Sequence, residues 1–97
     1  MTAAGRDRAC VHAVVRGDVQ GVGFRYFVQR QAWQEQLAGW VRNLPDGAVE
    51  CVAQGPRDAV ERLLAALREG PAMATVERVE EDWQAEQPGL QDFDVVG

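Results

Sequence analysis

The stretch of sequence that decides the fold is Arg16-Gly17-Asp18-Val19-Gln20-Gly21-Val22-Gly23-Phe24-Arg25. Apolar and polar residues alternate before it, which predicts a β-strand over residues 10–16. The segment after it lacks glycine and proline, which favours a helix from residue 24 to about residue 37. A glycine-rich turn from strand to helix can direct successive backbone N–H groups toward one point and so form a seat for an anion.

A phosphoryl group is the anion that this loop suits best. Arg25 falls in the first helical turn, where its planar guanidinium can close over a phosphate. The glycines are not followed by Gly-Lys-Ser/Thr, and their spacing is not that of a dinucleotide-binding loop. A turn that binds nothing, with Arg25 as a surface residue, is the alternative that the loop alone leaves open. The predicted phosphate-binding residues are Gln20, Gly21, Val22, Gly23, Phe24 and Arg25.

The length and composition favour one small domain over residues 1–97, with residues 1–9 as a flexible tail. No run of about 18 apolar residues is present, and the first residues contain no apolar segment typical of a signal peptide. We therefore expect no membrane span, a cytoplasmic location and, by default, a monomer.

The charge and the residue types exclude several functions. The net charge is −5, which argues against nucleic-acid binding, and the predicted strands 10–16 and 48–54 carry no aromatic residue for stacking RNA bases. The chain has no serine for Ser-His-Asp chemistry and no lysine for a Schiff base. One histidine and two cysteines do not make a zinc site, so we expect neither a metal nor a cofactor.

The two cysteines are expected to be free thiols. Strand alternation places Cys51 on the apolar face of its strand and Cys10 on the opposite face of the other strand. A disulfide between them would require a slip of strand register by one residue.

The remaining pattern predicts an α+β fold of order βαββαβ, with both helices on one face of an antiparallel sheet and a short extra strand at the end. Gly39 is expected to end the first helix, and Pro45-Asp46-Gly47 forms a turn between strands 40–44 and 48–54. The second helix begins at residues 55–58 and ends at Gly70-Pro71; its core residues are Val60, Leu63, Leu64 and Leu67. Strands 75–83 and 93–96 follow, the first with a bulge near Val76 and Val79.

The first helix has one irregularity. Its apolar stripe of Phe24, Phe27 and Val28 is interrupted at Gln31 and Glu35. Replacing Glu35 with leucine should therefore stabilise the protein if residue 35 faces the core. The sequence does not determine how the helix ends around Glu35 and Gln36.

Two motifs identify the chain as similar to a known family. Residues 17–25, Gly-Asp-Val-Gln-Gly-Val-Gly-Phe-Arg, and residues 39–50, Gly-Trp-Val-Arg-Asn-Leu-Pro-Asp-Gly-Ala-Val-Glu, resemble the signatures of the acylphosphatases. The resemblance runs from about Val11 to Val96. It implies a ferredoxin-like fold and the hydrolysis of acyl phosphates to a carboxylate and inorganic phosphate. In that family the loop and its arginine, here Arg25, bind the phosphate, and the asparagine of the second motif, here Asn43, positions the water.

The residue inventory agrees with that chemistry. A carboxylate leaving group needs no proton at neutral pH, because a carboxylic acid has a pKa of about 4. Asn43 can orient a water through its carboxamide, and the backbone N–H groups with Arg25 can supply the positive field without a metal. Two alternatives stay open: Asn43 can instead cap the turn that follows it, and the same fold can serve as a non-catalytic sensor of phosphate. An aromatic wall against the acyl group is conceivable, but Trp40, Trp83 and Phe93 are expected to be packing residues.

Overall fold

The computed structural model describes residues 7–97. The elements follow the predicted βαββαβ order and end in a short strand. They are β1 (Arg8–Asp18), α1 (Phe24–Gln34), β2 (Ala38–Asn43), β3 (Val49–Pro56), α2 (Arg57–Glu69), β4 (Thr75–Gln84) and β5 (Phe93–Val95). None of the helices within residues 7–97 is long and apolar enough to cross a bilayer.

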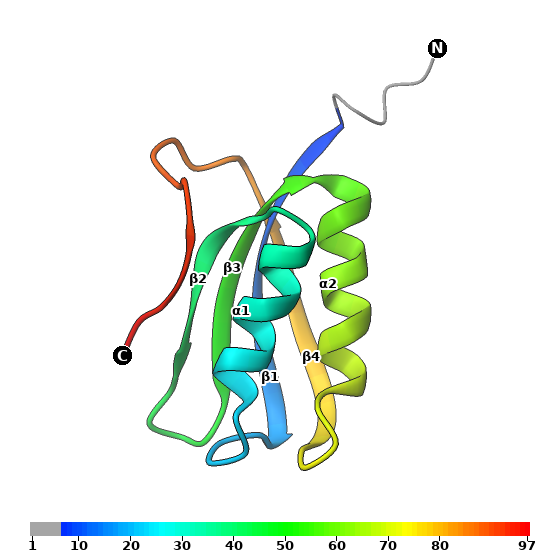
Figure 1. The fold of residues 1–97 in the computed structure, drawn as a ribbon, viewed down its shortest axis with the longest axis vertical. Helices are drawn as coiled ribbons and strands as arrows, with labels where there is room; N and C mark the ends of the chain where they lie inside the picture. The colour runs from blue at the N-terminus through cyan, green and yellow to red at the C-terminus, as the bar shows by residue number, and fades with distance from the viewer. Residues whose placement is uncertain (1–6) are drawn as a thin grey trace.

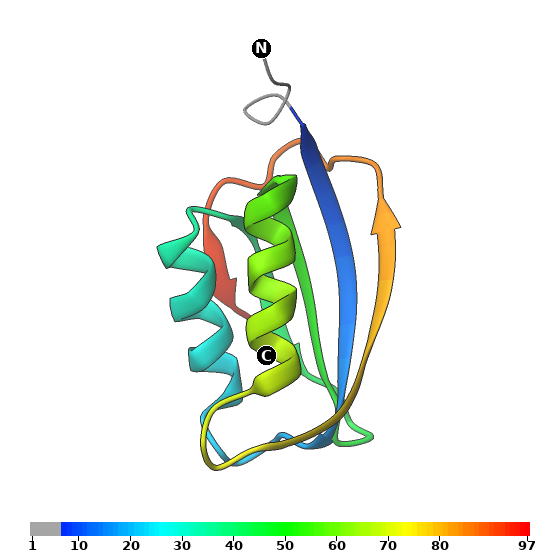
Figure 2. The same ribbon diagram turned by 90° about the vertical axis from the view of Figure 1, so that its right-hand side faces the viewer.

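The five strands form one sheet in the order β4-β1-β3-β2-β5. The β1–β3, β1–β4 and β2–β3 pairs are antiparallel, as predicted, whereas β5 lies parallel to β2 at the edge. Both helices cover the same face of the sheet, as Figures 1 and 2 show. This is the split βαβ arrangement of the ferredoxin-like fold, so the predicted fold class is confirmed.

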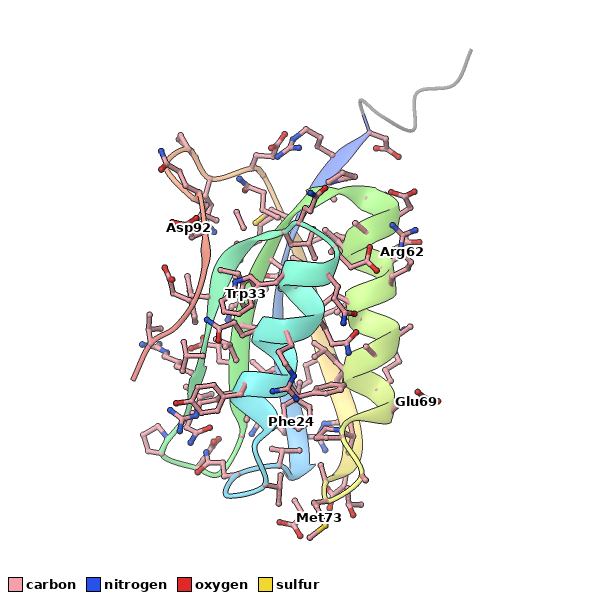
Figure 3. The ribbon with its side chains drawn as sticks, viewed as in Figure 1. Phe24, Trp33, Arg62, Glu69, Met73 and Asp92 are labelled. Atoms are coloured by element: carbon pink, nitrogen blue, oxygen red, sulfur yellow. The ribbon has the colours of Figure 1, made fainter. Side chains whose placement is uncertain are left out.

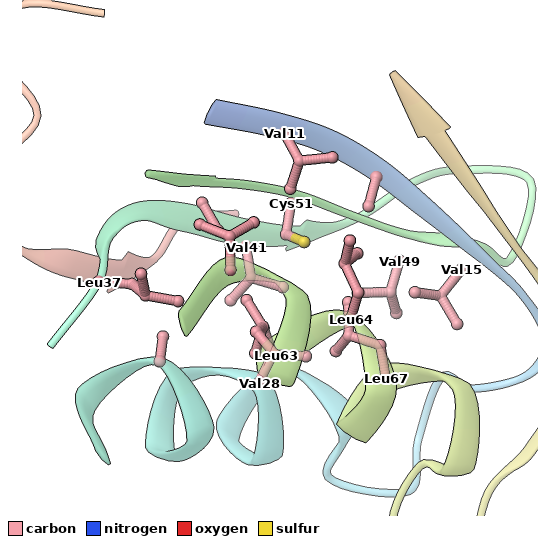
Figure 4. Close-up of a cluster of buried hydrophobic side chains, with 14 of the residues drawn as sticks. Val11, Val15, Val28, Leu37, Val41, Val49, Cys51, Leu63, Leu64 and Leu67 are labelled. Atoms are coloured by element: carbon pink, nitrogen blue, oxygen red, sulfur yellow. The ribbon is translucent and has the colours of Figure 1, made fainter. Parts of the chain in front are cut away.

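The hydrophobic core lies between the sheet and the two helices (Figure 4). Strand β1 contributes every second residue to it, as the alternation predicted. Helix α2 contributes the predicted stripe, since Val60, Leu63, Leu64 and Leu67 are all buried. Helix α1 contributes Phe24 and Val28, which fixes its rotation over the sheet.

Several strand boundaries differ from the prediction. Arg8 and Ala9 belong to β1 instead of to a tail, and residues 1–6 lie outside the described residues. Gly39 does not end α1 but lies inside β2, with a φ of 148°. A Cβ atom there would lie 1.8 Å from the Val52 carbonyl oxygen, so the close approach of β3 explains the glycine. The predicted bulge is confirmed, because the β1–β4 register skips Glu77.

Helix α1 ends three residues earlier than predicted, at Gln34. The Leu37 N–H donates to the Ala32 carbonyl and the Gln36 N–H to the Trp33 carbonyl, at 2.9 and 3.1 Å, which is a Schellman motif. Glu35 therefore lies past the end of the helix and does not face the core. The predicted stabilisation by Glu35→Leu required residue 35 to face the core, so this condition is not met. Its Oε1 accepts a hydrogen bond from Arg62 Nε at 2.9 Å, so Glu35 links the end of α1 to α2.

Gln36 carries the backbone strain of this helix end. Its φ is 57°, in the left-handed region that costs residues with a Cβ about 1–2 kcal/mol. We expect Gln36→Gly to raise the free energy of unfolding by about 0.5–1 kcal/mol, since glycine relieves the strain but gains freedom in the unfolded chain. Thermal melts would then show a midpoint about 3–5 °C higher. Gln36→Ala, which keeps the Cβ, is the control with an unchanged midpoint; a lower midpoint for the glycine variant would contradict the expectation.

Both cysteines are free, as predicted. Cys51 pairs with Ala13 on the helix-covered face, where burial raises the pKa of its thiol to about 12. Cys10 pairs with Gln54 and lies on the opposite face. It is nevertheless buried, because the segment after β4 folds over this end of the sheet: Gln87 N–H donates to Gln54 Oε1 at 2.6 Å.

Candidate active site

Two connections meet at one end of the sheet. The loop from β1 to α1 and the turn from β2 to β3 both lie at the bottom of Figure 1. Between them is a pocket of about 120 Å³, which is room for a phosphoryl group. Its lining residues are Val19, Gly21, Gly23, Phe24, Arg25, Tyr26 and Asn43.

The N-terminus of α1 opens into this pocket. Gly21 and Gly23 both have a φ of 76°, so the loop uses the left-handed conformation that glycine adopts without strain. The first helical hydrogen bond runs from the Phe27 N–H to the Gly23 carbonyl at 3.0 Å. The N–H groups of the preceding helical residues therefore have no partner within the helix, and no side chain of residues 7–97 caps the helix. The first turn holds no acidic residue, so the end of the helix can attract an anion.

Arg25, in the first turn of α1, also lines the pocket. One Nη1–H donates to the Gly97 carbonyl oxygen at 2.8 Å, which draws the side chain toward the segment after β5. Within residues 7–97, the other four N–H donors of the guanidinium have no hydrogen-bond partner, so they are available to a ligand in the pocket. A cation and a helix N-terminus thus converge on one small volume.

Asn43 reaches the pocket through strand alternation. It pairs with Val49 at the end of β2 and lies on the same face as the buried Val41, which is the face that the helices cover. The turn after it is closed by other groups: the Leu44 N–H donates to the Ala48 carbonyl, and the Ala48 N–H to Asp46 Oδ1. Within residues 7–97 no hydrogen bond engages the Asn43 carboxamide. The turn-capping alternative for Asn43 therefore finds no support.

Gln20 and Val22 lie in the predicted loop but do not line the pocket. The Gln20 amide donates to the Leu44 carbonyl at 2.7 Å and to the Ala48 carbonyl at 2.8 Å. These two bonds tie the loop to the turn that follows Asn43. Val22 packs against the hydrophobic core, which anchors the middle of the loop.

The charges around the turn are arranged in pairs. Arg16 Nη1 donates to Asp46 Oδ2 at 2.9 Å, and this bond holds the pKa of the Asp46 carboxyl below its usual value. Asp18, the carboxylate nearest the loop in sequence, is exposed at the end of β1. Within the described residues, no three His, Cys, Asp or Glu side chains gather into a possible metal site.

Besides the predicted Phe24, the pocket is lined by an aromatic residue that the sequence analysis did not single out. Phe93 is buried and Trp83 packs against the core, as predicted. Trp40 lies on the open face of the sheet, where Arg42 stacks over it with Cζ 5.3 Å from the ring centroid. Tyr26 lines the pocket instead. The sequence contained a signal for this role of Tyr26. Tyr26 directly follows Arg25, and it does not belong to the apolar stripe of Phe24 and Val28 that packs on the core.

The fold and the site together define a class: a ferredoxin-like sandwich in which the strand-to-helix loop and an asparagine line one small pocket. The sequence model of the acylphosphatase family matches residues 11–95. An acylphosphatase from Thermus thermophilus is 51% identical over 83 residues, which cover 86% of this chain and 93% of that protein. An acylphosphatase structure from Coxiella burnetii matches with a TM-score of 0.89 and 42% identity, over 99% of this chain and 100% of that one. The acylphosphatase structure from Bacillus subtilis also matches with a TM-score of 0.89, at 38% identity, over 92% of this chain and 99% of that one. The chain belongs to the acylphosphatase family.

Proposed function

We propose that Arg25 and Asn43 carry out acyl phosphate hydrolysis in this pocket, without a metal. The activity itself is that of the family: the chain is an acylphosphatase, and relatives that are about half identical over most of its length have the same activity. The observation that carries the residue assignment is the pocket, in which the Asn43 carboxamide, unpaired within residues 7–97, lies with Arg25 and a helix N-terminus. We further propose that the enzyme acts as a cytoplasmic monomer.

The phosphoryl group binds at the N-terminus of α1. The unpaired N–H groups of the first turn and the loop would bind its oxygens, and the guanidinium of Arg25 would neutralise part of their charge. Phosphoryl transfer passes through a loose transition state with charge on three equatorial oxygens. Donors that are already in position stabilise this charge without reorganising.

The attacking water is held by Asn43. Its amide oxygen accepts a hydrogen bond from the water and so directs the water's lone pair at phosphorus. The oxygen–phosphorus bond forms as the bond from phosphorus to the acyl oxygen breaks, and that oxygen takes the bonding electron pair. Because an amide is a poor base, the water's proton passes to an oxygen of the transferred phosphate.

The leaving group explains the substrate class. A carboxylate leaves as an anion at neutral pH, whereas an alkoxide would need a proton. An alkoxide leaving group would need a general acid such as histidine in the pocket. The histidine of this chain, His12, does not line the pocket, and its Nε2 lies 2.7 Å from Glu50 Oε2. Tyr26 supplies a hydroxyl there, but a phenol is a weak acid at neutral pH. We therefore expect acyl phosphates, and not phosphate monoesters, to be substrates.

A paired hydrolysis assay tests this proposal. The protein should hydrolyse acetyl phosphate at least about a hundredfold faster than glycerol 2-phosphate, because the carboxylate leaves without an acid catalyst whereas the alkoxide of glycerol does not. The rate should stay the same when EDTA is added, since the N–H groups and Arg25 supply the positive field. Loss of activity with EDTA and its return with Mg²⁺ would overturn the metal-free mechanism. Binding of phosphate without hydrolysis would instead indicate a sensor.

A further inference from the structure

One large apolar side chain at the pocket has no role in the mechanism above. Tyr26 is 54% exposed, although large aromatic side chains are usually well buried. It belongs to the first turn of α1 and lines the pocket with Arg25 and Asn43. The Arg25 Cζ lies 5.9 Å from the centroid of its ring. The Tyr26 ring therefore lies close to the guanidinium that would hold the phosphate.

The other pocket residues offer no comparable apolar surface. Val19 and Phe24 are each 1% exposed, because their side chains belong to the core. Gly21 and Gly23 have no side chains, and a Cβ at either would meet nothing within 4 Å, so this side of the loop is open. Of the residues that line the pocket, Tyr26 is thus the one with an accessible apolar face.

An acyl phosphate has a second half that must lie somewhere. In-line displacement places the acyl group on the side of phosphorus opposite the attacking water, and so away from the water that Asn43 holds. The phosphoryl group would take up part of the pocket, whose volume is about 120 Å³. The acyl group would lie beside it, toward the exposed ring of Tyr26, which also lines the pocket.

We propose that Tyr26 binds the acyl group and gives the enzyme a preference for acyl phosphates whose acyl group is aromatic. This inference rests on the proposed function. A flat aromatic acyl group can stack on the Tyr26 ring or meet it edge to face, whereas an acetyl methyl group covers little of it. The contact strengthens binding of the substrate and the transition state alike, so its effect falls mainly on KM.

The test compares benzoyl phosphate with acetyl phosphate. Tyr26→Ala should lower kcat/KM for benzoyl phosphate by about tenfold, mostly through a higher KM, and that for acetyl phosphate by about twofold at most. Tyr26→Phe keeps the ring and should keep the parent's preference, which separates the ring from the hydroxyl.

Trp33→Ala is the matched control. Trp33 is equally exposed, at 57%, and lies on the same helix (Figure 3). It is seven residues from Tyr26, about 10 Å along the helix axis, and its Nε1–H donates to the Phe93 carbonyl at 3.2 Å. A benzoyl group in the pocket would not reach it. The ratio of kcat/KM for the two substrates should therefore equal that of the parent.

Three results would overturn the inference, and one of them also tests the function. Equal losses on both substrates in Tyr26→Ala would mean that the ring only supports the loop around Arg25. An unchanged preference would mean that the acyl group does not touch Tyr26; in both cases acyl phosphate hydrolysis itself still stands. If the parent protein hydrolyses neither substrate, the proposed function fails and the inference fails with it.

Discussion

Replacing Arg25 with glutamine is expected to lower kcat/KM for an acyl phosphate by about a thousandfold. Among residues 7–97, the Arg25 guanidinium is the one cationic side chain that lines the pocket, and glutamine keeps some hydrogen bonding but removes the charge. Because Arg25 would contact the phosphate both in the bound substrate and in the transition state, KM should rise while kcat falls. Inhibition by inorganic phosphate should weaken by about tenfold or more, since the same contact holds the product.

Arg30→Gln is the control for this change. Arg30 lies on the exposed side of the same helix, and it does not line the pocket. The substitution alters the net charge of the protein equally, so it measures the effect of overall electrostatics. Steady-state kinetics should show less than a twofold change. If Arg25→Gln behaved like Arg30→Gln, the phosphate would have to bind elsewhere.

The helix–loop geometry at the pocket was predictable because it depends on local chemistry. Glycines at positive φ and an uninterrupted helical segment after them are sequence features, and the structure shows Gly21 and Gly23 in that conformation before α1. The placement of Asn43 on the helix side follows from alternation with Val41. The chemical roles of Arg25 and Asn43 are still predictions, because geometry shows only that the two residues share a pocket.

The features that the sequence did not predict depend on contacts between distant segments. Gly39 resembles a helix cap in sequence, but the approach of β3 requires it within β2. The left-handed residue that follows the end of α1 is Gln36, which carries a Cβ, and the Leu37 beside it is buried. The side-chain amide of Gln20 binds carbonyls that are 24 and 28 residues away, a contact that the sequence did not predict. Local propensity contains no information about such partners.

Asn43→Ala is expected to reduce kcat by about a hundredfold while inhibition by inorganic phosphate changes by threefold at most. The two effects separate because Asn43 would act on the water, whereas Arg25 and the helix N-terminus hold the phosphate. A group that serves the transition state alone changes kcat and kcat/KM together. The thermal midpoint should stay close to that of the parent, since the carboxamide makes no hydrogen bond within residues 7–97 that the alanine would remove.

Arg42→Gln controls for a change in the same strand. Arg42 precedes Asn43 but faces the open side of the sheet, where its Nε donates to Glu50 Oε1 at 2.6 Å. The kcat of the Arg42→Gln variant should lie within twofold of that of the parent protein. Asn43→Asp adds a sharper test, because a carboxylate of the same shape could still hold the water but would repel the phosphate, so phosphate inhibition should weaken. Near-full kcat in Asn43→Ala would show that the water is held by another group, such as the loop backbone, and the assignment of Asn43 would then be wrong.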